Sequence, residues 1–185
     1  TLRVFELAED MVAFARELEV ETPPYFTEGA FMHFHRGRYY LSYSHGSYRD
    51  ATYSVHYATS DSVTGPWDYQ GRILSSDARH KGPGHHSFFR DPGTDAWYIA
   101  YHRWNDRAGD GPFRGSRQLA IDRIAYDSTG ALLPVEMTDT GVSIPDGIRP
   151  EAPFAGVPGI VIDHAPQAEG LYIGSPSLAV LQSGT

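Results

Sequence analysis

The chain has 185 residues, with 23 acidic and 15 basic side chains, a net charge of −8 at pH 7, and no cysteine. This length allows one domain with a sizeable core, and the missing cysteines exclude disulfides and thiolate metal sites. The chain is acidic, has no basic cluster and lacks an apolar run of the roughly 20 residues that a membrane span needs, so nucleic acid and membrane are poor partners.

The composition favours an all-β protein with surfaces that suit carbohydrate. Aromatic residues make up 13% of the chain, including 12 Tyr and 3 Trp, and 19 Gly and 13 Pro are available for turns. The apolar faces of sugar rings stack on aromatic rings, while sugar hydroxyls need polar neighbours. Carbohydrate is therefore the partner that this composition suits.

The first segment, residues 5–18, fits two kinds of secondary structure. Its spacing and propensity allow a helix. Residues 3–7 and 12–21 also fit two strands around a turn at 8–11, and we favour this pair of strands.

The next segment predicts a hairpin with an acidic residue at its entrance. Residues 29–35 and 38–44 are rich in aromatic and apolar types, and Arg36-Gly37 between them suits a hairpin turn. Side chains alternate along a strand, so one face of the second strand carries Tyr40, Ser42 and Ser44. Glu28 stands at the start of the first strand, where it is either a solvated strand-end acid or part of a site.

Later strands and turns follow in alternation along the chain. We expect strands at 52–60, 86–90, 96–102 and 117–126. Turn signals separate them at 64–66, 82–84, 91–93 and 128–130.

The chain also contains an internal repeat. GRYYLSYS at 37–44 matches DAWYIAYH at 95–102, an offset of 58 residues that aligns Glu28 with His86, next to His85. Units of four strands over roughly 40–50 residues are typical of β-propeller blades, although chance similarity between Tyr-rich strands is the alternative. Because the inner strands of a propeller line a central channel, we expect Glu28 and the two histidines to face one axial pocket.

The order of several motifs resembles glycoside hydrolase family 43. These motifs are TEGAF, GRYYLSYS, YSVHYATSDSVTGPWDY, GPGHHSFF, WYIAYHRW and RQLAIDRI, and the resemblance covers residues 1 to about 143. It implies about three blades of a five-bladed β-propeller, the C-terminal part of an inverting glycosidase. The implied substrates are arabinose- or xylose-containing polysaccharides or oligosaccharides, with arabinofuranosidase or xylosidase activity. A carbohydrate-binding propeller without catalysis is the alternative.

The resemblance also implies roles for individual residues. Glu28, in the E-G motif, matches the general acid, and desolvation by nearby aromatic rings favours the neutral form that a proton donor needs. His85 matches a position that faces the channel and holds a metal ion, often Ca²⁺, through water. Calcium prefers oxygen ligands, so one imidazole is not a calcium site by itself. Arg117 matches an arginine that reaches the sugar or the carboxylates.

Two further candidates for substrate binding are His86, beside His85, and Trp104, which we expect in a loop after a strand and exposed to sugar. Either histidine could instead be an inner-strand residue bonded to backbone, and Arg117 could be an ordinary surface residue.

The match to the family is partial. The family's base Asp and the Asp that tunes its acid precede the matched region, so we expect the chain alone to be inactive. Residues 144–170, rich in Pro, Gly and Ala, are expected to be a linker. Residues 171–185 either begin a second β domain, with weak similarity to the start of sialidase-like repeats, or close the propeller. The parent protein is therefore expected to be multidomain.

Overall fold

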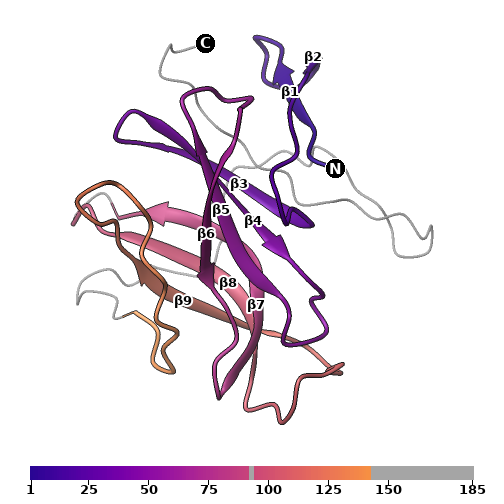
Figure 1. Cartoon of the computed structure of the whole chain (residues 1–185), viewed down its shortest axis with the longest axis vertical. Coiled ribbons are helices and arrows are strands. Elements are labelled where there is room, and N and C mark those ends of the chain that lie inside the picture. Colours follow the sequence, from indigo (N-terminus) through magenta and orange to yellow (C-terminus); the bar gives the residue numbers. More distant parts are fainter. Residues whose placement is uncertain (92–93, 143–185) are drawn as a thin grey trace, which may run out of the picture.

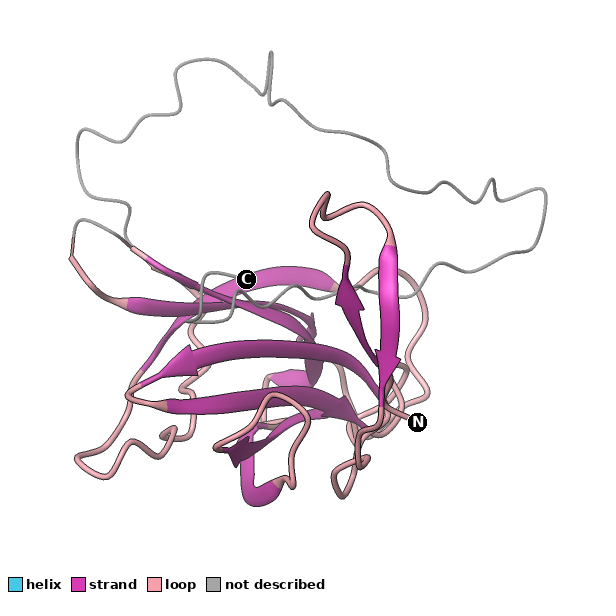
Figure 2. Ribbon diagram, turned by 90° about the horizontal axis from the view of Figure 1, so that it is seen from above, coloured by secondary structure: helices cyan, strands magenta, loops and turns pink. Residues whose placement is uncertain are grey.

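The computed structural model describes residues 1–91 and 94–142, so the expected linker at 144–170 and the β segment at 171–185 lie outside the described residues. The described part consists of strands and loops without a helix (Figures 1 and 2). It accordingly holds no helix of the length and apolarity needed to cross a membrane.

The described residues contain nine strands, which form three antiparallel sheets. The first sheet pairs β1 with β2, the second has the order β3-β4-β5-β6, and the third has the order β7-β8-β9. Every strand is paired with the one before or after it in the chain, as in a series of meanders. The strands are β1 Val4–Leu7, β2 Phe14–Leu18, β3 Glu28–His35, β4 Arg38–His45, β5 Ser54–Ser60, β6 Asp68–Leu74, β7 His80–Arg90, β8 Trp97–Asn105 and β9 Gln118–Ile124.

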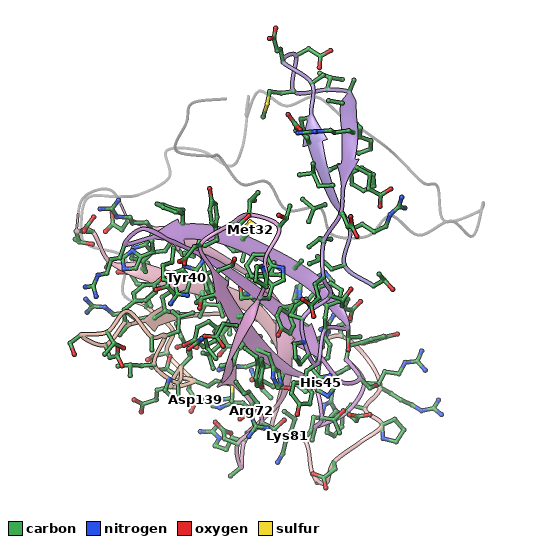
Figure 3. The ribbon with its side chains drawn as sticks, turned by 45° about the horizontal axis from the view of Figure 1, so that its top comes forward. Met32, Tyr40, His45, Arg72, Lys81 and Asp139 are labelled. Carbon is green, nitrogen blue, oxygen red and sulfur yellow. The ribbon has the colours of Figure 1, made fainter. Side chains whose placement is uncertain are left out.

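The N-terminal segment is a hairpin, which confirms the two-strand interpretation and not the helix. β1 and β2 pair antiparallel, and the rings of Phe5 and Phe14 stack across them at 4.7 Å. In the connection, the Asp10 carboxylate accepts hydrogen bonds from the backbone of Val12 and Ala13. This hairpin stands away from the two larger sheets (Figure 3).

The expected hairpin of residues 29–44 is also confirmed, as β3 and β4. The alternation along β4 separates two packing environments. Tyr40 belongs to the core between the second and third sheets. Leu41 and Tyr43 belong to a separate cluster, in which they pack with Leu2, Met32, Ala58 and Trp67. The second sheet is therefore buried on both faces, which explains why every residue of β5 is buried.

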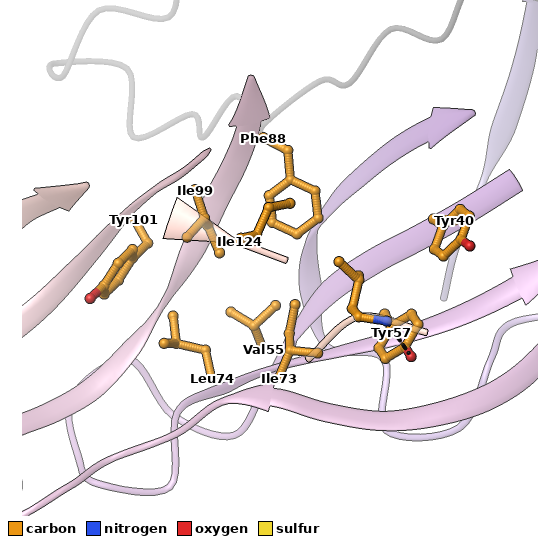
Figure 4. Packing of buried hydrophobic residues seen from close by; sticks show 10 residues of the cluster. Tyr40, Val55, Tyr57, Ile73, Leu74, Phe88, Ile99, Tyr101 and Ile124 are labelled. Atoms are coloured by element: carbon orange, nitrogen blue, oxygen red, sulfur yellow. Dashed lines mark hydrogen bonds between the residues drawn. The ribbon is translucent and has the colours of Figure 1, made fainter. Parts of the chain in front are cut away.

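The main core lies between the second and third sheets, as Figure 4 shows. The second sheet contributes Tyr40, Val55, Tyr57, Ile73 and Leu74, and the third contributes Phe88, Ile99, Tyr101 and Ile124. Leu132, after β9, completes the cluster, and its backbone N–H donates to the Tyr57 hydroxyl at 3.0 Å. β7 packs against β3, β4 and β5.

The internal repeat corresponds to these two sheets, because β3, β4 and β5 take the places that β7, β8 and β9 take in the third sheet. One strand was missed, and several predicted boundaries differ from those observed. β6 was not expected, β7 begins at residue 80 and not 86, and β8 continues to residue 105 and not 102.

Candidate active site

Glu28 lies at the first residue of β3, where the strand meets the end of β4. It pairs with Ser44, and the register shifts immediately after it. Gly29 has a φ of +63°, and a Cβ at this position would lie 3.3 Å from Ser44 Oγ and 3.5 Å from His85 Cα. Glycine adopts this left-handed conformation with the least strain. Glycine at position 29 therefore allows the chain to turn close to β7 where β3 begins. In this conformation the Glu28 side chain is 35% exposed.

A buried tyrosine holds the Glu28 carboxyl group. The hydroxyl of Tyr53, the residue before β5, donates to Glu28 Oε1 at 2.6 Å. Tyr53 itself is 0% exposed. Burial and, after it, the hydrogen bond to Glu28 raise the pKa of Tyr53 well above its ordinary value. The phenol therefore stays protonated and acts as the donor.

His85 of β7 completes the group around Glu28. Its Nδ1 lies 3.5 Å from the Tyr53 hydroxyl and 4.0 Å from Glu28 Oε1. The backbone N–H of His85 donates to Ser44 Oγ at 2.8 Å, which ties β7 to β4. The structure thus brings Glu28 and His85 to one place from two sheets. His45 and Lys81, labelled in Figure 3, mark this end of the two sheets.

Arg117, just before β9, reaches the same group from the third sheet. Its guanidinium carbon lies 5.7 Å from the centre of the Tyr53 ring and 5.3 Å from that of Tyr48. Arg117 also acts on His102 of β8, whose pKa is lowered by burial and then by the charge of Arg117. The Tyr48 ring is 45% exposed, so a flat aromatic surface adjoins this arginine.

Glu28 therefore presents a partly exposed carboxyl group that is held by a neutral donor and lies beside an imidazole and a guanidinium. Such a group is suited to proton donation to a bound polar ligand. The model of glycosyl hydrolase family 43 matches residues 4–132, well over half of the chain. The chain belongs to glycosyl hydrolase family 43.

Curated relatives are longer than this chain. A β-D-galactofuranosidase of Aspergillus niger is 38% identical over 143 residues, which cover 75% of this chain and 40% of that protein. A xylosidase/arabinosidase of Bacteroides ovatus is 31% identical over 151 residues, covering 74% of this chain and 43% of that protein. The chain therefore spans about two fifths of the length of these relatives.

Solved structures agree with the family and the fold. A glycoside hydrolase superposes with a TM-score of 0.67 and 27% identity over 81% of this chain and 34% of its own. A family 43 arabinoxylan arabinofuranohydrolase from Bacillus subtilis, in complex with cellotetraose, superposes with a TM-score of 0.58 and 25% identity. The match covers 76% of this chain and 30% of that chain. The expected all-β fold, a partial β-propeller, is confirmed.

Trp104 is not the exposed platform that we expected from its place after a strand. It lies within β8 and not in a loop, because the strand continues to Asn105. Its side chain is 3% exposed, packs against Phe113, and donates from Nε1 to the Tyr48 carbonyl at 3.0 Å. Trp104 supports the loop that carries Tyr48, so a direct sugar contact by its ring is not part of our proposal.

His86 is also turned away from the site, although it follows His85 directly. Its ring is buried, contacts Phe31 and Phe88, and places Nε2 2.7 Å from Ser42 Oγ. Burial, with smaller effects from neighbouring histidines, lowers the pKa of His86 to about 3, so the ring is neutral. A buried ring of this kind is not accessible to a substrate, contrary to our expectation. Its contact with Ser42 instead connects β7 to β4.

The described residues do not fit a calcium site by themselves. Among residues 1–91 and 94–142, no group of three or more His, Cys, Asp or Glu side chains is placed to hold a metal ion. Calcium takes six to eight oxygen ligands, whereas this site offers one carboxyl group that already accepts from Tyr53. Calcium at His85 stays a prediction, and no step below depends on a metal.

Two residues of this site were missed by the sequence analysis. Tyr53 and Tyr48 stand among many tyrosines, and neither has a motif that separates it from core residues. Tyr53 could have been noticed as the residue directly before a strand rich in small and buried types. Nothing in the sequence indicates that Tyr48 points outward.

Proposed function

We propose that the protein containing this chain is an inverting glycoside hydrolase acting on arabinose- or xylose-containing polysaccharides or oligosaccharides. Glu28 is its general acid. The names of the relatives support this class, since they include a xylosidase/arabinosidase and an arabinoxylan arabinofuranohydrolase. The observation that carries the proposal is the Glu28 carboxyl group, which is 35% exposed at a strand end and is held by Tyr53 beside His85 and Arg117.

The chemistry needs a proton donor on one side of the scissile bond and an activated water on the other. Glu28 donates its proton to the leaving glycosidic oxygen. We assign the base that activates water to none of the described residues. Arg117 contacts sugar hydroxyls, and Tyr48 offers the aromatic face that we first assigned to Trp104.

Replacing Glu28 by Gln tests the acid in the full-length protein. Glu28→Gln keeps the shape of the side chain but removes the transferable proton. General acid catalysis contributes roughly 10²–10⁴-fold, so kcat on natural arabinosides or xylosides should fall by about that factor. An aryl glycoside with a good leaving group needs little protonation and should lose much less.

The matched control is Glu19→Gln, which changes an exposed glutamate outside the site and should leave both rates unchanged. Equal loss on both substrates, or no loss on either, contradicts the assignment of Glu28. If the wild-type protein binds oligosaccharides but hydrolyses none of the arabinofuranoside, xyloside or galactofuranoside substrates, it is a carbohydrate-binding propeller.

A further inference from the structure

The Tyr53 side chain is held tightly in the position from which it contacts Glu28. The Tyr53 ring is fully buried and has no room to move away from the acid. On one side lies Gly84, where a Cβ would come within 2.3 Å of the Tyr53 ring. On another side lies the Arg117 guanidinium, 5.7 Å from the ring centre. The phenol hydroxyl is thereby held at a fixed point, 2.6 Å from Glu28 Oε1.

This arrangement explains the second glycine of the GPGHH segment. Gly84 pairs with His102 and lies between two register shifts of β7. Any side chain larger than hydrogen at residue 84 would enter the space of the Tyr53 ring. The close approach of β7 backbone to an aromatic ring therefore serves to hold Tyr53 in place against Glu28.

We propose that Tyr53 is a positioning residue for the general acid, whose hydroxyl holds Glu28 Oε1 and thereby directs the transferable proton to Oε2. This inference rests on the proposed function. The proton that reaches the leaving oxygen comes from Glu28, and Tyr53 keeps its own throughout. A neutral hydroxyl can donate to Oε1 whether the carboxyl group is ionised or protonated, so it maintains the same orientation before and after the transfer.

The other groups near Glu28 are less suited to this role. His85 Nδ1 lies at 4.0 Å from Oε1, beyond hydrogen-bond distance. The Ser44 hydroxyl acts on Tyr53 itself, since its hydrogen bond opposes the rise in the pKa of Tyr53. Arg117 lies over the Tyr53 ring, and its charge acts on His102. Tyr53 is the group that contacts the acid directly through a short hydrogen bond.

Tyr53→Phe removes this hydroxyl and keeps the ring that packs on Gly84. In the full-length protein we expect kcat on natural glycosides to fall roughly tenfold, with KM unchanged, because a misplaced acid transfers its proton less often. An aryl glycoside with a good leaving group should lose less than threefold, since it depends little on protonation. A residue with only a structural role would not separate the two substrates.

A double-mutant cycle makes the test specific to the pair. Once Glu28→Gln has removed the proton, there is nothing left for Tyr53 to direct, so adding Tyr53→Phe should cause little further loss. The matched control is Tyr101→Phe, because the buried Tyr101 hydroxyl donates to Asp122 at 2.7 Å in the third sheet. That variant should lower the thermal midpoint without any dependence on the leaving group.

If Tyr53→Phe does not fold, NMR spectroscopy provides a second test of the contact between Tyr53 and Glu28. In protein with ¹³C-labelled tyrosine, the signal of the Tyr53 carbon bearing the hydroxyl should shift between wild type and Glu28→Gln, while that of Tyr101 should not. Equal losses on both substrates, additive effects in the cycle, or an unmoved Tyr53 signal overturn the inference and leave Glu28 as the acid. A Glu28→Gln variant that does not distinguish the substrates overturns the proposed function, and this inference with it.

Discussion

At the scale of single residues, Arg117 connects the two tyrosines of the site. Its guanidinium lies near the ring of Tyr53, which is buried, and near that of Tyr48, which is exposed. The loop of Tyr48 is ordered by its neighbours, since the Tyr48 carbonyl accepts from Trp104 and the Arg49 carbonyl accepts from the Phe113 backbone. An aromatic ring held in place loses little conformational entropy when a sugar stacks on it.

We therefore predict that Tyr48→Ala weakens the binding of oligosaccharides by up to roughly tenfold, because stacking of this kind contributes about 0.5–1.5 kcal/mol. KM should rise while kcat stays near its wild-type value, and Tyr48→Trp should restore binding. The control is Phe89→Ala, which removes an exposed ring at the far end of β7. Calorimetry on the inactive Glu28→Gln protein measures the affinity directly, and an unchanged affinity in Tyr48→Ala contradicts the platform.

Two residues of this site were indicated by the sequence because they stand in motifs. Glu28 and Arg117 belong to motifs whose order is specific, and the structure places both at one site. The sequence did not indicate that Trp104 and His86 are buried, because exposure depends on where β8 ends and on which face of β7 a residue lies. Alternation cannot be read through the irregular segment 81–87, where the register shifts twice.

At the scale of elements, the start of β7 is joined to the segment after β9 by a buried histidine. His80 places Nδ1 2.8 Å from Asp77 Oδ2 and Nε2 2.9 Å from Asp139 Oδ1. Arg79 forms a second ion pair with Asp139. These contacts attach residues that follow the last strand to the first strand of the same sheet.

The hydrogen bond from His80 lowers the pKa of Asp139. Burial raises the pKa of Asp77, but hydrogen bonds from the His80 backbone and side chain outweigh it, so that pKa is lowered as well. Because both carboxyl groups ionise more easily in the folded state, their contribution to stability is present above their ordinary pKa of about 3.9 and is lost as the pH falls below it.

We predict that Asp139→Asn lowers the urea midpoint of unfolding at pH 6 and has little effect near pH 3. Asp61→Asn, which removes the exposed partner of Arg38, serves as the control and should change the midpoint slightly at either pH. A difference between wild type and Asp139→Asn that is as large at pH 3 as at pH 6 would show that the carboxylate charge is not involved.

The elements themselves were largely predictable where hydrophobic alternation and turn residues agree. β4 and β8 are long, regular and rich in aromatic residues, and both were expected near their observed positions. β6 escaped detection because Gly71 interrupts it and most of its side chains are polar or exposed. Its pairing with β5, which is buried throughout, supplies the stability that its own sequence does not indicate.

At the scale of the whole molecule, stability depends on the layer between the second and third sheets. Leu74 is 2% exposed within this layer. We predict that Leu74→Ala lowers the free energy of unfolding by about 2–5 kcal/mol, the range for buried leucines. Leu119→Ala, at an exposed position of β9, should change it by less than about 0.5 kcal/mol. Urea unfolding measures both, and similar values for the two variants contradict a core at this interface.

The burial of Trp104 has an optical consequence. Its indole N–H donates to the carbonyl of Tyr48, and its ring is shielded from water between the two sheets' loops. Indole emission depends on the polarity around the ring and on the hydrogen bond that its nitrogen makes. Trp104 is thus an intrinsic fluorophore coupled to the loop beside Glu28, and a sugar that stacks on Tyr48 should change the wavelength of its emission without any added label.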